Sequence, residues 1–259
     1  MPFHSITLND GRKIPQIGFG TWKIPQEVTA AQVDQAVEVG FDHIDTAQGA
    51  LIGNIPPAYV RSLIIVYRNE EQVGQAIKEG GLARKDLWIT TKWSGVDDKD
   101  AQVSINESLE KLGVDYVDLY LIHHPRVTKG DIKGAWEAME DIQKQGKAKS
   151  IGVSKWVDLL RPELFLIPSF SVDDLKELLK HAKVKPVVNQ ILLHPYVIGT
   201  QQPLLDYLHK EHIVPEGYST LIPITSKPGG PVDKPVDKLA KKYKVEPEQI
   251  LLAWSKAKQ

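Results

Sequence analysis

The sequence predicts an α/β protein built around a parallel sheet, and three observations favour this fold class. Short apolar runs alternate with amphipathic stretches along the whole chain. The apolar runs are nearly continuous, which is typical of strands buried on both faces. Polar residues stand at the ends of successive runs. Repeated strand–helix units of this kind form either a doubly wound sheet or a (β/α)8 barrel, and the pattern leaves both open.

The elements follow in a regular order after an N-terminal hairpin. The hairpin is expected in residues 5–17, because Asn9, Asp10 and Gly11 form a turn between two short apolar segments. Seven strands are expected at 15–21, 43–47, 87–92, 117–123, 148–154, 186–192 and 212–219. Helices are expected near 29–40, 69–81, 98–112, 131–145, 171–182 and 201–210, with two more within 235–258. Ser171 followed by Asp174 resembles a capping box at the start of the helix over 171–182.

Composition excludes several classes of protein. The chain has 259 residues, of which 42% are hydrophobic and 25% charged, as in ordinary globular proteins. A net charge of −1 gives no electrostatic basis for binding nucleic acid or an anionic membrane. The absence of cysteine excludes disulfides, thiolate metal sites and thiol nucleophiles. No apolar run reaches about 18 residues and no secretory signal is visible, so we expect a single cytoplasmic domain over 1–259, monomeric and without metal.

The strand ends carry chemically useful groups. In chain order these are Asp45, Lys92, His123, Ser154, Gln190, Tyr218 and Ser219. In a barrel these ends converge on one face, where active sites are built. An ammonium lowers the pKa of a nearby phenol, a carboxylate holds the ammonium, and an imidazole supports a developing oxyanion. This set of side chains suits the reduction of a carbonyl group. The hydride would come from a nicotinamide cofactor, because no side chain can carry a hydride. The chain has no G-x-G-x-x-G, P-loop or H-E-x-x-H motif.

These residues stand within motifs that resemble one known family. The motifs are GFGTWK (18–23), HIDTA (43–47), YRNEEQVG (67–74), ITTK (89–92), DLYLIHHP (118–125), IGVS (151–154), VVNQILLHP (187–195) and GYSTL (217–221). In this order they resemble the aldo-keto reductase superfamily. The resemblance implies a (β/α)8 barrel that binds NADPH without a Rossmann fold and reduces aldehydes or ketones to alcohols.

The resemblance also implies roles for individual residues. Tyr67 would be the general acid, Lys92 the partner that lowers its pKa, Asp45 the anchor of Lys92, and His123 the residue that orients the carbonyl. The expected cofactor contacts are Thr21, Trp22, Lys23, Asp45, Ser154, Gln190, Tyr218, Ser219 and Leu221. The expected walls of the substrate pocket are Trp22, Trp93 and His124.

The chain departs from the family pattern in three places. The family has its tyrosine five residues after the aspartate, but Asp45 and Tyr67 are 22 positions apart because 49–66 intervenes. The family reads G-V-S-N-F, but 155–169 stands between Ser154 and Phe170. The chain ends where the eighth strand and the C-terminal loop are expected. In the family the residues that bind the 2′-phosphate of NADPH follow that strand, so the residues present do not distinguish NADPH from NADH.

Both atypical segments have features of translated introns. In 49–66, eleven of 18 residues are apolar and only Arg61 is charged, which is unusual for a surface loop. The excess lengths of 17 and 14 residues equal 51 and 42 nucleotides, and the codons permit GT…AG boundaries in both cases. Removal would leave a valine before Tyr67 and an asparagine before Phe170, which restores both family motifs.

Two alternatives to an active reductase stay open. The first is a catalytically impaired, truncated form, because without the eighth strand the first and seventh strands are unpaired edges and the barrel does not close. The second is a nicotinamide-binding regulatory subunit, a role that some members of the superfamily have.

The intron hypothesis makes a direct prediction about the mature transcript. Reads across codons 49–66 and 155–169 should skip 51 and 42 nucleotides and continue in frame to Tyr67 and Phe170. Sequencing of amplified cDNA checks this, with genomic DNA as the control that retains both segments. A mature transcript that keeps both segments contradicts the hypothesis.

Overall fold

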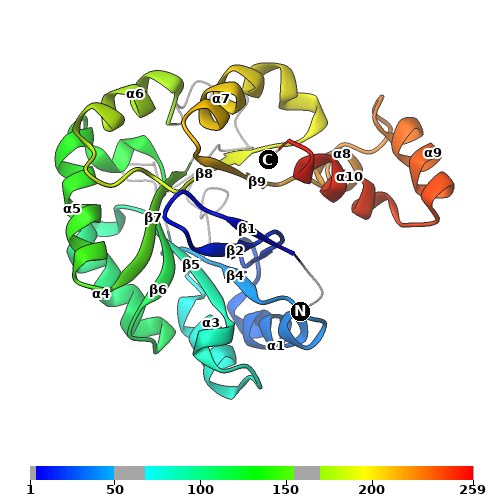
Figure 1. Ribbon diagram of the computed structural model, residues 1–259. Coiled ribbons are helices and arrows are strands. Elements are labelled where there is room, and N and C mark those ends of the chain that lie inside the picture. Colours follow the sequence, from blue (N-terminus) through cyan, green and yellow to red (C-terminus); the bar gives the residue numbers. More distant parts are fainter. Residues whose placement is uncertain (1–3, 50–67, 155–169, 259) are drawn as a thin grey trace, which may run out of the picture.

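The computed structural model describes residues 4–49, 68–154 and 170–258. Seven parallel strands form one curled sheet in chain order, with helices outside it (Figure 1). The strands are β3 (Phe19–Gly20), β4 (His43–Asp45), β5 (Trp88–Trp93), β6 (Val117–Ile122), β7 (Ala148–Ser154), β8 (Val188–Leu192) and β9 (Val214–Tyr218). The curled sheet resolves the choice that the sequence left open in favour of the barrel. Within the described ranges β3 and β9 do not pair with each other, so the barrel is open along this side.

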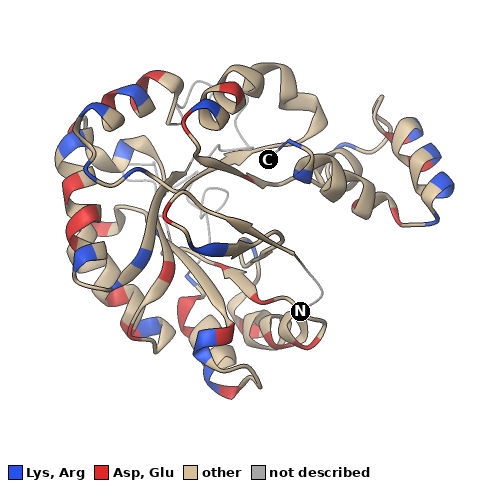
Figure 2. Ribbon diagram, in the orientation of Figure 1, with Lys and Arg blue, Asp and Glu red and all other residues tan. Residues whose placement is uncertain are grey.

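The helices that cover the sheet are close to their expected positions. They are α1 (Gln26–Glu38), α3 (Glu70–Glu79), α4 (Ala101–Leu112), α5 (Ile132–Lys144), α6 (Val172–His181), α7 (Ile198–Lys210), α8 (Ile222–Thr225), α9 (Asp233–Tyr243) and α10 (Pro247–Lys256). Short 3₁₀ turns lie at Arg84–Asp86, Val96–Asp98, Pro125–Thr128 and Pro195–Val197. In the view of Figure 2, Lys and Arg are intermixed with Asp and Glu on the outer helices. None of these helices has the length and apolar character that a membrane span requires.

Local sequence explains the helix boundaries, including those that differ from expectation. The capping box at Ser171 and Asp174 is confirmed, since each side chain bonds the other residue's backbone N–H. Helix α7 begins at Ile198 instead of 201, which places Pro203 inside the helix. The four-residue helix α8 was not expected, because Pro223 and the short length give no periodic signal.

The N-terminal hairpin covers the amino-terminal ends of the strands. Strands β1 (Ser5–Thr7) and β2 (Lys13–Pro15) pair in antiparallel fashion, as expected. Asn9 Nδ2 donates to the backbone oxygens of Pro186 and His212 at 2.9 and 3.0 Å. Ser150 Oγ donates to Asp10 Oδ2 at 2.6 Å. The turn is therefore fixed beneath β7, β8 and β9. Since Pro15 belongs to the hairpin, β3 is confined to two residues of the expected 15–21.

Two apolar layers enclose the sheet. The outer layer, between strands and helices, includes the fully buried Trp136, Met139 and Phe170. The inner layer joins Leu8 and Ile14 of the hairpin segment to Leu119 and Leu121 of β6. The inner layer fills the lower part of the barrel, so the polar ends of the strands meet only at the opposite, carboxyl end.

Close packing of α3 on α4 predicts an unusual response to alanine. A Cβ at Gly74 would lie 2.4 Å from the backbone oxygen of Lys111. Gly74→Ala should therefore lower the free energy of unfolding by about 1–3 kcal/mol, although alanine favours helices. Gly81→Ala is the control, because a Cβ there meets nothing within 4 Å. Urea denaturation measures the free energy of unfolding of both variants. If this free energy is unchanged or higher in Gly74→Ala, α3 and α4 can move apart without cost and the prediction is wrong.

Candidate active site

A buried ion pair joins the ends of β4 and β5. Lys92 Nζ lies 2.5 Å from Asp45 Oδ1 and donates to the backbone oxygen of Thr46 at 2.9 Å. The Lys92 side chain is fully buried, whereas that of Asp45 is 13% exposed. A buried ammonium is tolerated only when it is paired and hydrogen-bonded. The pair therefore fixes a positive charge inside the barrel at the carboxyl end of the sheet.

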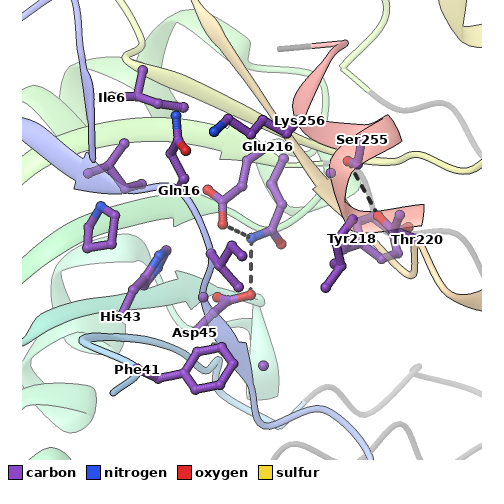
Figure 3. Close-up of a pocket in the computed structure, with 18 of the residues that line it drawn as sticks. Ile6, Gln16, Phe41, His43, Asp45, Glu216, Tyr218, Thr220, Ser255 and Lys256 are labelled. Carbon is purple, nitrogen blue, oxygen red and sulfur yellow. Dashed lines mark hydrogen bonds between the residues drawn. The ribbon is translucent and has the colours of Figure 1, made fainter. Parts of the chain in front are cut away.

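The second oxygen of Asp45 extends the pair into a longer network. Gln190 Nε2 donates to Asp45 Oδ2 at 3.1 Å and to Glu216 Oε1 at 3.0 Å (Figure 3). Glu216 Oε2 is buried and has no hydrogen-bond partner in the described part of the chain. Burial, followed by the nearby charge of Asp45, raises the pKa of Glu216 to about 7, while Gln190 and Lys92 oppose the shift. Glu216 therefore titrates near neutral pH.

His123 stands directly after β6 and beside the end of β5. Its backbone N–H donates to the oxygen of Trp93 at 3.0 Å, and its Nδ1 lies 2.7 Å from Ser94 Oγ. Burial lowers the pKa of His123 well below its usual value, and the charges of Lys92 and His124 lower it further. His123 is therefore a neutral imidazole at physiological pH.

Strands β7, β8 and β9 align three polar side chains. Ser154 is in register with Gln190, and Gln190 is in register with Glu216. Residues in register on neighbouring strands point to the same face of a sheet, so the three side chains are adjacent. Ser154 and Gln190 are both buried. Because the Gln190 nitrogen serves two carboxylates, its amide oxygen is the atom that remains to accept a hydrogen bond from a ligand.

A cleft of about 690 Å³ opens onto this network along the unpaired side of the barrel. It lies between the hairpin, β3, β4, β9 and α10 (Figure 3). Of the residues expected from the sequence, it is lined by Asp45, Gln190, Tyr218, Ser219 and Leu221. The aromatic ring of Tyr218 and the polar side chains of β8 and β9 thus share one cavity.

The residues after β3 form a separate group beside α1. Thr21 is buried, and its hydroxyl donates to Thr46 Oγ1 at 2.9 Å. Lys23 is exposed, with Nζ 4.3 Å from the centroid of the Trp22 ring. Trp22 Nε1 is buried and has no hydrogen-bond partner within the described ranges. The backbone N–H of Thr21 also donates to the oxygen of Asp45 at 2.9 Å, so this segment is joined directly to the end of β4.

The remaining expected substrate residues differ in their surroundings. Trp93 lies in the outer core and donates from Nε1 to the oxygen of Lys99 at 2.9 Å, so it packs between sheet and helices. His124 is partly buried, with its ring centroid 6.0 Å from that of His123. Burial lowers the pKa of His124 to about 4, with a contribution from Arg126. Both histidines are therefore neutral at pH 7.

Tyr67 and the two atypical segments, 49–66 and 155–169, lie outside the described residues except for Gly49. Two described residues of the site were not expected from the sequence. Glu216 had a visible signal, namely a carboxylate inside an apolar strand, whereas Ser94 had none beyond its place after Trp93. Chemically, the site holds a fixed ammonium, a neutral imidazole and an amide–hydroxyl pair beside an aromatic ring, and a carbonyl group is what such donors bind and polarise.

Comparisons with known proteins identify a family for the chain. The model for the Aldo/keto reductase family matches residues 16–259. "Aldehyde reductase YPR1" of Saccharomyces cerevisiae is 34% identical over 97% of this chain and 78% of its own length. "Methylglyoxal reductase DkgA" of Escherichia coli is 35% identical over 96% of this chain and 78% of its own.

Solved structures show the same fold. An aldo/keto reductase from Brucella melitensis has a TM-score of 0.75 and 34% identity, over 97% of this chain and 84% of its own. A Bombyx mori aldo-keto reductase in complex with NADP has a TM-score of 0.74 and 32% identity, over 97% of this chain and 79% of its own.

The raised pKa of Glu216 predicts how stability depends on pH. The folded state binds the Glu216 proton more tightly than the unfolded state, so this group's stabilising contribution is present below about pH 4.5 and is lost as pH rises to about 7. Glu216→Gln removes this loss and should raise the free energy of unfolding at pH 8 by on the order of 2 kcal/mol. At pH 4 the variant and the wild type should be equal, as measured by urea denaturation at each pH.

Glu177→Gln is the matched control for this measurement. Hydrogen bonds from Lys180 and then His181 lower the pKa of Glu177, which is exposed on α6. Its substitution should therefore give no gain in stability at pH 8. Parallel pH profiles for wild type and Glu216→Gln would show that Glu216 titrates as in the unfolded chain.

Proposed function

The chain belongs to the aldo/keto reductase family, and on this premise we propose that it reduces aldehydes or ketones to alcohols with NADPH as hydride donor. The observation that carries the proposal is the buried Lys92–Asp45 pair beside a neutral His123 at the carboxyl end of the strands. Names of relatives support the chemistry, since one is a "Glycerol 2-dehydrogenase (NADP(+))".

The described residues fit the nicotinamide end of the cofactor. A carboxamide needs a donor for its oxygen and an acceptor for its nitrogen, and Ser154 Oγ and Gln190 Oε1 would supply them. The Tyr218 ring would offer a flat face for stacking. When bound, NADPH supplies a hydride to the carbonyl carbon of the substrate. The further contacts proposed for the cofactor are Thr21, Trp22, Lys23, Asp45, Ser219 and Leu221.

We assign the proton step to Tyr67. A phenol has a pKa of about 10 and gives up its proton slowly near neutrality. An ammonium such as Lys92 within a few ångström lowers that pKa, and Asp45 holds Lys92 in place. Tyr67 would give its phenolic proton to the substrate oxygen while the carbonyl carbon gains the hydride, so the product is a neutral alcohol.

His123 would position the substrate oxygen. Because it is neutral, it would donate a hydrogen bond to the carbonyl without placing a full second charge beside Lys92. Trp22 and His124 are the proposed walls around the substrate, and Trp93 is retained only as a residue that packs behind the site. We also propose that the protein is a single cytoplasmic domain and a monomer. Residues 49–66 and 155–169 are proposed to be of intronic origin.

One observation supports a catalytically impaired form as the second candidate. The edges of β3 and β9 are unpaired in the described part of the sheet, and the cleft between them reaches Asp45 and Gln190. Water in that cleft would weaken the electrostatic effect of Lys92 on a phenol. The impaired form predicts NADPH binding with little turnover, as does the third candidate, a nicotinamide-binding regulatory subunit.

The assignment of Tyr67 is tested by removing one oxygen. Tyr67→Phe should lower kcat for an aldehyde such as methylglyoxal by about 10²–10⁴-fold, because the general acid is lost. NADPH binding, followed by fluorescence quenching, should stay unchanged. Tyr243→Phe is the control, since Tyr243 is 60% exposed on α9.

The outcomes separate the candidates. Turnover in the wild type that falls in Tyr67→Phe alone supports the reductase with Tyr67 as its acid. Full activity in Tyr67→Phe rejects Tyr67 as the acid. Wild-type NADPH binding without turnover favours the impaired or regulatory form.

A further inference from the structure

Ser94 is the residue that directly contacts the ring of His123 from the end of β5. Ser94 Oγ lies 2.7 Å from His123 Nδ1 and 3.2 Å from the backbone oxygen of Gln48. Both Ser94 and His123 are buried. A serine hydroxyl has one hydrogen, so it donates to only one of these two acceptors.

The two distances indicate which acceptor receives the hydrogen. Hydrogen bonds donated to oxygen by hydroxyl groups span about 2.5–3.0 Å, and those donated by N–H groups span about 2.7–3.2 Å and centre near 2.9–3.0 Å. The contact to His123 Nδ1 lies within the hydroxyl range, whereas the contact to the Gln48 oxygen lies beyond it. Both distances favour the hydroxyl as the donor to Nδ1, and in that arrangement Nδ1 carries a lone pair and no proton.

The backbone holds Ser94 in this position. The N–H of His123 donates to the oxygen of Trp93 at 3.0 Å, which places residue 94 beside the imidazole. Gly95 follows with a φ of 66°, and a Cβ there would lie 2.9 Å from Val127 Cγ1. Only glycine turns the chain here without strain or a clash, so the orientation of Ser94 is set by the end of the strand itself.

Because His123 is neutral, its contact with Ser94 can determine which ring nitrogen carries the proton. Burial and the charge of Lys92 keep the imidazole neutral, so it carries one proton on one of two nitrogens. Which nitrogen holds the proton is set by the hydrogen bond that the other nitrogen makes. A neutral imidazole donates to a carbonyl oxygen only through its protonated nitrogen.

We propose that Ser94 is a positioning residue that keeps the proton of His123 on Nε2, the nitrogen that donates to the substrate carbonyl. The inference rests on the proposed function for the role of that hydrogen bond in catalysis. The assignment of the tautomer rests on the two contacts of the Ser94 hydroxyl. Ser94 acts through His123 and does not touch the reacting atoms.

The tautomer is measured directly by ¹⁵N NMR of the full-length chain labelled at histidine. In the wild type, His123 Nδ1 should resonate as an unprotonated imidazole nitrogen and Nε2 as a protonated one. His123→Gln identifies the signals. Ser94→Ala should lose this preference and shift both resonances toward the average of the two tautomers. Ser94→Thr keeps the hydroxyl and should restore the wild-type pattern.

Kinetics provide the second readout. Ser94→Ala should lower kcat about 5- to 20-fold, the effect of one hydrogen bond, with a smaller change in the KM for NADPH, and Ser94→Thr should recover most of the loss. Ser150→Ala is the matched control, because Ser150 is also a buried serine but donates to Asp10 beneath the sheet. It should leave the His123 resonances and kcat unchanged.

The outcomes distinguish this inference from the proposed function. A protonated Nδ1 in the wild type overturns the inference whatever the activity, as does a Ser94→Ala protein with an unchanged His123 spectrum. The expected spectrum with a normal kcat in Ser94→Ala overturns the positioning role. A wild type that shows the expected spectrum but no reductase activity contradicts the proposed function and supports the tautomer assignment.

Discussion

The burial of one ammonium group is the constraint on which the site depends. Lys92 is fully enclosed by the sheet, and water does not solvate its charge. The structure compensates with Asp45 Oδ1 and the oxygen of Thr46, at the ends of the neighbouring strand. Because Asp45 is thereby neutralised on one oxygen, its other oxygen accepts from Gln190, and Gln190 in turn reaches Glu216. One buried charge thus organises side chains from four strands.

The same charge influences the titratable groups around it. Burial is the main cause of the low pKa of His123, and the positive charge of Lys92 adds to it. Lys92 opposes the rise in the pKa of Glu216, which burial and Asp45 produce. The carboxyl end of the barrel therefore combines a fixed cation paired with the Asp45 carboxylate, the neutral imidazoles of His123 and His124, and the Glu216 carboxyl group, whose pKa is raised to about 7. A site with this balance polarises a carbonyl oxygen without holding an excess of uncompensated charge.

The open side of the barrel has a simple structural origin. Each parallel strand pairs with its neighbours in chain order, so the described residues form one curled sheet of seven strands. The first and last strands of this sheet, β3 and β9, do not pair with each other, and the barrel stays open between them. Backbone groups and side chains at these two edges border the cleft that reaches Asp45 and Gln190. The hairpin lies across the opposite end and is held there through Asn9 and Asp10, whereas the cleft borders the network on the unpaired side of the sheet.

The sequence by itself determined the order of strands and helices, the capping box at Ser171 and the identity of most polar groups at the strand ends. These features follow from local periodicity and from residue types that a strand end exposes. It did not decide between a doubly wound sheet and a barrel, because both use the same repeated unit. The bond between Ser94 and His123, the link from Asp45 to Glu216, and the packing of Trp93 away from the site were decided by the tertiary structure alone. Each depends on the register between strands that are distant in sequence, and register is set by how the whole sheet curls and packs.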